Sequence, residues 1–229
     1  MRIVVDARMP EAVKAGLAAY GETYEFASRG ISYESVSGHP DIFMCQTPAG
    51  LILAPNSPAE FVEFLAVNHI SFSFGLLPLG PVYPESARYN AVCTQKYLVH
   101  HSSVTDPAIL TANPVLQKIQ VPQGYARCNL LALNEDQFIT SDKGIEKQLL
   151  AGGVEVLYVS PAGILLPGMT QGFFGGCCGI HRDQLMIAGS LDYLPRGEDV
   201  RAFAAKAGLS VVELYQGPLF DGGGIFSLE

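Results

Sequence analysis

The stretch A-R-C-N-L-L-A-L-N-E-D-Q-F-I-T-S-D-K-G-I-E-K-Q-L-L-A-G-G-V-E-V-L-Y-V, residues 126–159, decides the fold because it holds one complete structural unit. Its pattern predicts a strand, a turn and a second strand over 129–140. Either Ser141 or Asp142 then caps a helix that stops at a Gly-Gly pair, and 154–159 forms a third strand. The stretch therefore predicts a strand–strand–helix–strand unit.

The same unit recurs five times along the 229 residues. Its first strands are expected to start at Asp41, Asn90, Asn129, Gly179 and Gly224. Successive starts lie 39 to 50 residues apart, and the step from the last start through the two termini to the first is 46 residues. Repeats of this size are typical of units that cannot bury their apolar faces alone. Because the period closes across the termini, we predict an α/β fold in which five repeats form a five-bladed α/β-propeller.

The fifth unit is split between the two ends of the chain. Its first strand is expected at 225–228, and its second at 2–6. Pairing of these terminal strands would close the ring and satisfy strand edges that would otherwise stay open. The alternative is an ordinary three-layer α/β domain whose spacing is coincidental. No low-complexity linker interrupts the chain, so residues 1–229 are predicted to form a single domain.

Composition narrows the classes of partner. The chain is 48% hydrophobic and 16% charged with a net charge of −8, and it has no Lys/Arg run, so no nucleic-acid partner is expected. The most apolar stretch, 70–83, is cut by glycines and prolines, so no membrane helix is expected. Five cysteines without a staple-like spacing indicate reduced thiols and a cytoplasmic location.

Four short motifs carry a family resemblance. They are G-Y-A-R-C-N from Gly124, I-T-S-D-K-G-I from Ile139, G-F-F-G-G-C-C-G from Gly172 and P-L-F-D-G-G-G from Pro218. With the five-unit ring, they make the chain resemble an uncharacterised bacterial branch of the pentein fold, the α/β-propeller of guanidine-modifying enzymes. The same fold also carries a ribosome anti-association factor without an active site, so the fold alone does not give the function.

The resemblance implies a chemistry. In pentein enzymes a cysteine thiolate attacks the guanidinium carbon, carboxylates grip the flat cationic nitrogens, and a histidine moves protons. The usual nucleophile lies near the C-terminus, but here Gly222-Gly-Gly-Ile-Phe-Ser-Leu places Ser227 at that position. A serine is a poor replacement, because the thiolate makes the attack feasible near neutral pH.

A closed ring permits a rotated version of the same site. G-H-P-D occurs at 38–41, Asn90-Ala-Val-Cys-Thr-Gln is similar to the nucleophile segment but one residue shorter, and Asp221-Gly-Gly is similar to the E-G-G carboxylate segment. In ring order these segments imply Cys93 as nucleophile, His39 as acid/base and Asp221 as the substrate-orienting carboxylate. A buried, inert thiol is the competing interpretation of Cys93.

The aligned strand starts predict the substrate-binding residues. Equivalent positions of a rotational repeat face the same way, so Asp41, Asn90 and Asn129 are expected to line the channel with Gly179 and Gly224. One carboxylate and two amides suit a small cationic ligand. The charge of −8 also favours such a ligand.

Other thiols and ions give weaker signals. Cys177, Cys178 and Cys128 are alternative channel thiols, although tight packing is the commoner role for such cysteines. No C-x-x-C or H-x-x-x-H pattern exists, so no metal site is expected. No glycine run has the strand-to-helix context of a phosphate loop, so no cofactor is expected.

Two function classes follow. The first is a small-molecule enzyme that binds a guanidine- or amidine-like molecule in the channel, as a cysteine-dependent hydrolase or an amidinotransferase-like enzyme. The alternative is a catalytically silent propeller that binds a ligand or a protein. Thiol reactivity separates them, because a catalytic Cys93 would react with iodoacetamide faster than the other four cysteines.

Overall fold

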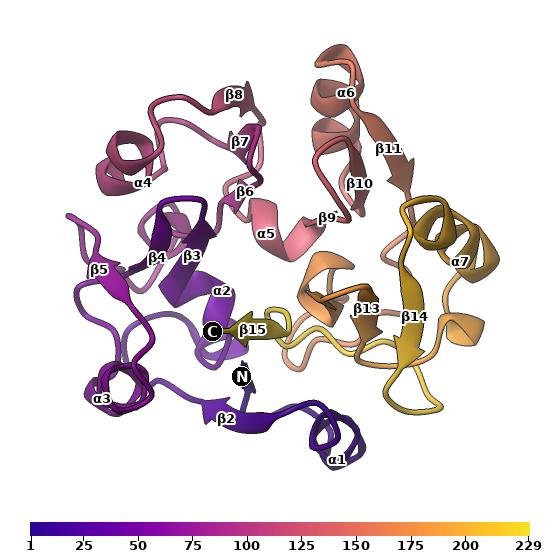
Figure 1. Ribbon diagram of the computed structural model, residues 1–229, viewed down its shortest axis with the longest axis horizontal. Coiled ribbons are helices and arrows are strands. Elements are labelled where there is room, and N and C mark those ends of the chain that lie inside the picture. Colours follow the sequence, from indigo (N-terminus) through magenta and orange to yellow (C-terminus); the bar gives the residue numbers. More distant parts are fainter.

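The computed structural model describes residues 1–229 and contains five separate three-stranded sheets. Figure 1 shows these sheets arranged around a common centre, with the longer helices at the periphery. No ladder joins one sheet to the next, so the strands do not form one closed sheet. The chain therefore has a mixed α/β fold built from five similar units.

All five sheets share one topology. The first strand is antiparallel to the middle strand, which is parallel to the third, and an outer helix connects the middle and third strands. The sheets are β15 (Phe226–Leu228), β1 (Arg2–Asp6) and β2 (Glu22–Phe26); β3 (Met44–Thr47), β4 (Gly50–Leu53) and β5 (Phe72–Phe74); β6 (Val92–Cys93), β7 (Tyr97–His100) and β8 (Gln117–Gln120); β9 (Leu130–Ala132), β10 (Gln137–Thr140) and β11 (Glu155–Tyr158); and β12 (Cys178–His181), β13 (Gln184–Ile187) and β14 (Ser210–Glu213). The outer helices are α1 (Glu11–Leu17), α3 (Ala59–Val67), α4 (Pro107–Ala112), α6 (Lys143–Ala151) and α7 (Gly197–Lys206).

The two termini share one sheet. β15 pairs antiparallel with β1, with Ile3 opposite Ser227 and Val4 opposite Phe226. Both chain ends lie near the centre in Figure 1. The predicted pairing of the terminal strands is therefore confirmed, and it makes the fifth unit from the two ends of the chain.

Short helices, rather than strands, occupy two of the predicted strand starts. The predicted strand starts at Asp41 and Asn129 are wrong, because Asp41 lies in α2 (Pro40–Phe43) and Asn129 ends α5 (Ala126–Asn129). Pro40 occupies the first turn of α2, where its fixed φ suits a helix and its missing N–H costs nothing. Figure 1 shows both helices near the centre.

Local signals of the unit first quoted are confirmed. The Asp142 carboxylate accepts a hydrogen bond from the Ile145 N–H at 2.8 Å, so Asp142 and not Ser141 caps α6. Ile145 and Leu149 on the inner face of this helix are fully buried. The same arrangement in α3 buries Phe61 and Leu65. Each outer helix thus covers its sheet and leaves the centre to loops and short helices. No helix has the length and apolar character needed to span a bilayer.

Candidate functional site

Three chemically reactive side chains converge at the centre of the ring of units. A ring nitrogen of His39, a carboxylate oxygen of Asp41 and the sulfur of Cys128 lie within 4.8 Å of one another. Cys128 comes from α5, Asp41 from α2, and His39 precedes α2 in the G-H-P-D motif. All three are buried, with at most 4% of each residue exposed. Segments 87 residues apart therefore form one site.

The thiol of Cys128 is held by hydrogen bonds. It donates to Asp41 Oδ2 at 3.0 Å and accepts from Asn90 Nδ2 at 3.3 Å. Asn90 also donates to the Asp41 backbone carbonyl and accepts from the Cys128 backbone N–H. The Asn90 amide thereby joins α2 to α5 and sets the distance between the carboxylate and the sulfur.

His39 lies between two further carboxylates. Its Nδ1 is 3.9 Å from Asp221 Oδ1, and its Nε2 is 3.9 Å from Asp6 Oδ2. Neither ring nitrogen makes a hydrogen bond, and Asp41 Oδ1 also lacks a partner. Buried polar atoms are normally paired, so three unpaired atoms at one place indicate a site that receives a ligand or water.

Both flanking carboxylates are fixed from behind. Asp221 accepts hydrogen bonds from the backbone N–H groups of Phe173 at 2.8 Å and Gly223 at 3.1 Å. Asp6 receives a two-pronged contact from the Arg8 guanidinium, at 3.0 Å from Nε and 2.7 Å from Nη2. The positions of these carboxylates therefore do not depend on His39.

The glycine-rich motifs of the sequence pack against this cluster. A Cβ at Gly38 would collide with the Asp6 carboxylate, one at Gly176 with the Asp221 carboxylate, and one at Gly223 with the His39 side chain. Gly223 also has a φ of +68°, a conformation that favours glycine. Close approach to buried charged groups thus partly explains the motifs G-H-P-D, D-G-G-G and G-F-F-G-G.

Burial dominates the ionisation of the cluster. It raises the pKa of Asp41 to about 6 and the pKa of Asp221 to about 6. It lowers the pKa of His39, although the two flanking carboxylates oppose this. Burial, reinforced by Asp41 and Asp221, raises the pKa of the Cys128 thiol well above its usual value. Without a cation, the site therefore holds a thiol and a neutral imidazole.

The predicted triad is only partly brought together. His39 and Asp221 are neighbours at the centre, as their assigned roles require. Cys93 instead lies in β6, half-exposed, beside Cys45 on the adjacent unit, where it raises the pKa of the Cys45 thiol. No hydrogen bond or ion pair joins it to His39 or Asp221, and the sulfur at the cluster belongs to Cys128.

The predicted substrate-binding residues are all buried, but they differ in their contacts. Asp41 and Asn90 contact the Cys128 sulfur directly. Asn129 instead donates to the Tyr125 carbonyl and accepts from the Ser141 hydroxyl, which ties α5 to the start of α6. Its side chain is therefore occupied within the fold.

Sequence reasoning ranked Cys128 below Cys93 and missed Asp6. The motif G-Y-A-R-C-N drew attention to Cys128, but the pattern around Cys93 is closer to a nucleophile segment. Asp6 ends β1 and carries no motif of its own. Its only sequence signal is a buried strand that closes on a charge. The convergence of His39, Asp41 and Cys128 also has no local sequence motif, because Cys128 lies 87 residues from Asp41.

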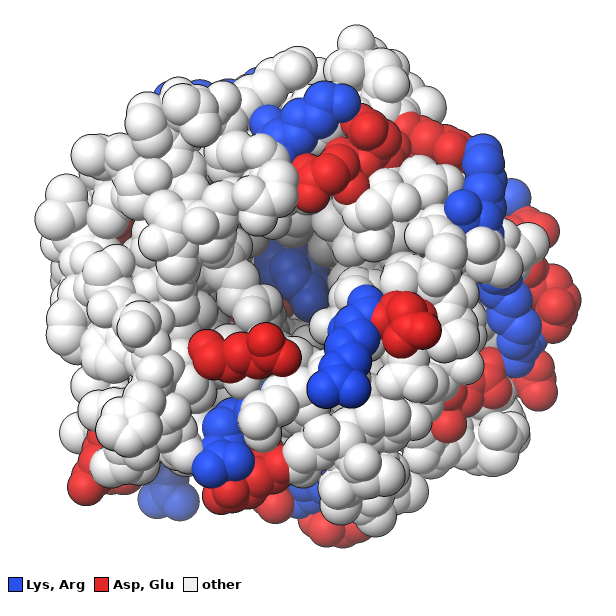
Figure 2. All heavy atoms as spheres, in the orientation of Figure 1, with Lys and Arg blue, Asp and Glu red and all other residues white.

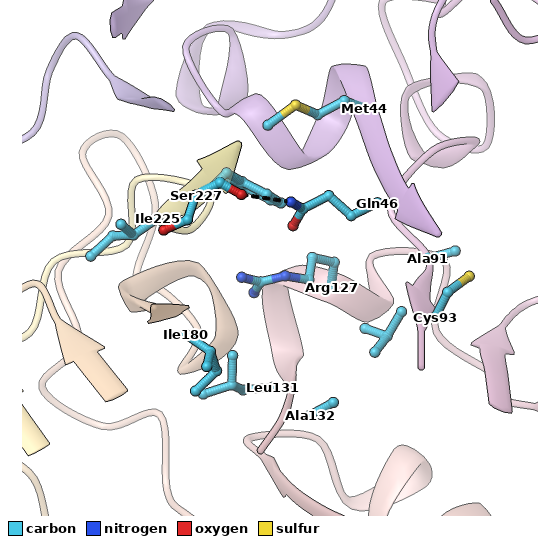
Figure 3. Close-up of a pocket in the computed structure, with 12 residues that line it drawn as sticks. Met44, Gln46, Ala91, Cys93, Arg127, Leu131, Ala132, Ile180, Ile225 and Ser227 are labelled. Carbon is cyan, nitrogen blue, oxygen red and sulfur yellow. Dashed lines mark hydrogen bonds between the residues drawn. The ribbon is translucent and has the colours of Figure 1, made fainter. Parts of the chain in front are cut away.

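A separate pocket opens on the face of the molecule seen in Figure 2. Its cavity is about 170 Å³, and none of the four side chains His39, Asp41, Cys128 and Asp221 lines it. Arg127 is the only Lys or Arg in its wall, and Figure 2 shows a blue side chain at the floor of the central hollow. Figure 3 shows its guanidinium pointing into the pocket.

The fold of this chain is shared with an amidinotransferase and with DDAH. The amidinotransferase SxtG of the saxitoxin pathway of Microseira wollei superimposes with a TM-score of 0.55 at 7% identity, over 92% of this chain and 87% of that one. DDAH from Pseudomonas aeruginosa, a cysteine-to-serine mutant complexed with citrulline, superimposes with a TM-score of 0.54 at 10% identity, over 93% and 91%. At identities this low, the superpositions establish a shared fold and nothing more.

The chain itself belongs to a family of unknown function (DUF6873), whose model matches residues 4–226. A search of curated proteins gives no match.

Proposed function

We propose that this protein binds a small cationic guanidine- or amidine-like molecule at the central cluster and acts on it as a cysteine-dependent hydrolase or amidinotransferase. The proposal rests on one observation, the convergence of the Cys128 thiol, the His39 imidazole and buried carboxylates with unpaired polar atoms. The shared fold supports it, since one similar structure is an amidinotransferase and another holds citrulline. We interpret residues 1–229 as a single domain and its five units as blades of a propeller around this site.

The carboxylates supply what a guanidinium needs. Asp41 Oδ1 has no partner, and Asp221 and Asp6 flank His39 on either side. A planar cation between these oxygens would be bound by charge-assisted hydrogen bonds in a site without bulk water. Its positive charge would favour the ionised forms of Asp41, Asp221 and the neighbouring Cys128 thiol. The ligand would therefore create the thiolate that the empty site disfavours.

The chemistry then follows in two steps. The proton of the Cys128 thiol passes to His39 as the sulfur forms a bond to the guanidinium carbon, and the C–N bond to the leaving amine breaks as that nitrogen takes this proton from His39. His39 next removes a proton from water, or from an acceptor amine, as this nucleophile attacks the same carbon. The C–S bond breaks and releases a ureido product in the first case or a new guanidine in the second.

A catalytically silent binding module is the second candidate, and burial of the cluster favours it. His39, Asp41 and Cys128 have almost no exposed surface, and the pKa of the Cys128 thiol is raised. Such a protein would bind the same cationic ligand by Asp41 and Asp221 without forming a covalent bond. The two candidates differ only in what happens to the sulfur.

Activity on a panel of guanidino compounds tests the proposal. The purified protein is incubated with arginine, agmatine, N-methylated arginines and guanidinoacetate, with and without an amine acceptor. Ureido and guanidino products are quantified by mass spectrometry, and the intact protein mass reveals a covalent adduct. We expect turnover of at least one compound and its loss in Cys128→Ser.

Cys93→Ser is the matched control, because it makes the same atomic change at a thiol outside the cluster. If Cys93→Ser abolished turnover and Cys128→Ser did not, the rotated triad of Cys93, His39 and Asp221 would be correct instead. Binding of a compound without turnover or adduct would favour the silent module. Absence of both binding and turnover across the panel would contradict a guanidine site.

A further inference from the structure

The pocket above Arg127 is a second candidate site, and its lining residues differ from those of the central cluster. Nine of its twelve lining residues are hydrophobic, including Leu131, Ile180 and Ile225. Gln46 and Ser227 add an amide and a hydroxyl to the wall, and the Gln46 amide donates to the Ser227 carbonyl at 3.0 Å. The pocket therefore has an apolar wall with few polar groups, the arrangement typical of small-molecule sites.

Arg127 brings the one positive charge in this wall, and, against the larger effect of burial, this charge also lowers the pKa of the Asp41 carboxylate in the central cluster. Its guanidinium donates to the backbone carbonyls of Gly175 at 2.6 Å and Cys178 at 3.1 Å and lies over the Phe226 ring. None of these partners is an anion, and Arg127 is in no ion pair. A guanidinium has five N–H donors, so three remain after these two bonds. No Asp or Glu lines the pocket.

The size of the cavity restricts the occupant. A cavity of about 150 Å³ lined by apolar side chains holds one benzene molecule, and this pocket measures about 170 Å³. A ring or short branched chain bearing one acidic group would fill it. Because only one cation lines the pocket, a single negative charge matches it better than a phosphate dianion.

We propose that this pocket binds a small organic carboxylate, with the carboxylate on Arg127 and the apolar body against the hydrophobic wall. This goes beyond the proposed function, because none of His39, Asp41, Cys128 and Asp221 lines the pocket and the ligand has the opposite charge. Burial of a carboxylate beside a fixed guanidinium in a largely apolar wall gives a charge-assisted contact. The apolar body removes hydrocarbon surface from water.

Binding of benzoate, measured by ligand-observed NMR and calorimetry, tests this directly. A ligand of this size with one charge-assisted contact should bind with a Kd of about 1 mM or tighter. Benzamide has the same shape without the charge, and its affinity should be at least about tenfold weaker, as loss of one charged hydrogen bond predicts. Equal affinity for benzoate and benzamide would overturn the assignment of an anion.

Two variants locate the site. Arg127→Gln removes the charge, and Ala132→Phe fills the pocket from β9 while leaving Arg127 in place. Each should weaken benzoate binding at least about tenfold, whereas Ala15→Phe on the exposed side of α1 should leave it unchanged. Arg127 also donates hydrogen bonds to backbone carbonyls, so circular dichroism is used to check that Arg127→Gln is folded. If Arg127→Gln is unfolded, Ala132→Phe alone decides the test. Unchanged binding in Ala132→Phe, or no binding by the wild type, would overturn the proposal.

Discussion

Asp41→Asn tests whether the central carboxylate is maintained at a cost in stability. Asp41 is fully buried, and one of its oxygens has no hydrogen-bond partner. An asparagine has nearly the same shape and can still accept the hydrogen bond from Cys128. The substitution therefore removes a buried charge while changing little else.

The expected gain depends on pH, and its sign follows from linkage. The pKa of Asp41 is raised from 3.8 to about 6 in the folded protein, so the folded state binds more protons than the unfolded state between these values. Stability is thus lost as pH rises from about 4 to 6, by about 3 kcal/mol for a shift of this size. Asp41→Asn should recover roughly 1–3 kcal/mol at pH 8 and almost nothing below pH 4.

Urea denaturation at pH 4 and pH 8 provides the measurement, with Asp183→Asn as the control. Asp183 is exposed and has no ion pair, so its substitution should change the free energy of unfolding little at either pH. Ligand binding at the central site should weaken in Asp41→Asn even as the protein becomes more stable. Equal destabilisation by Asp41→Asn at both pH values would refute the reasoning, because Asp41 would then be a satisfied structural residue.

Three further predictions concern single features of the fold and site. Gly223→Ala should lower the free energy of unfolding in urea by more than about 2 kcal/mol, because it combines a positive φ with a collision against a buried histidine. Gly153→Ala, also at positive φ but in open space, should lower it by only about 1 kcal/mol. Equal losses in the two variants would contradict the packing argument. Asp142→Ala should cost about 1 kcal/mol by removing the cap of α6, and no change in the urea midpoint would count against that cap. In the ligand-free native protein, iodoacetamide should modify Cys93 first, because the other four cysteines are buried, and peptide mapping that found any of those four modified faster would disprove this order.

The sequence predicted the units well because their signals are local. The unit around 129–159 carries a cap, a Gly-Gly stop and apolar strands, all within one segment, and each is present in the structure. The terminal pairing was predictable from the period, since strands 2–6 and 225–228 complete one unit. The starts of the first strands were not predictable, because a single helical turn such as α2 contains too few residues to show a helical period.

The site was harder to predict, because it depends on which of several thiols reaches the centre. The segment at 90–95 has the better motif, but its first strand has only two residues, and Cys93 lies beside Cys45 in the wall of the pocket. Cys128 reaches the centre because the α5 turn inserts it beside Asp41. The order of motifs along the chain predicts which units lie next to each other at the centre. The short helices at the centre determine which side chains of those units come into contact.

Stability alone does not explain the central cluster. Asp6, Asp41 and Asp221 surround a histidine whose two nitrogens lack partners, and apolar side chains of similar volume would avoid that desolvation. Three glycines also give up their side chains so that the charged groups can approach one another. Local features that lower stability in this way are typical of functional sites. The burial that makes the cluster costly would also strengthen its binding of the proposed cation, because charges interact more strongly away from bulk water.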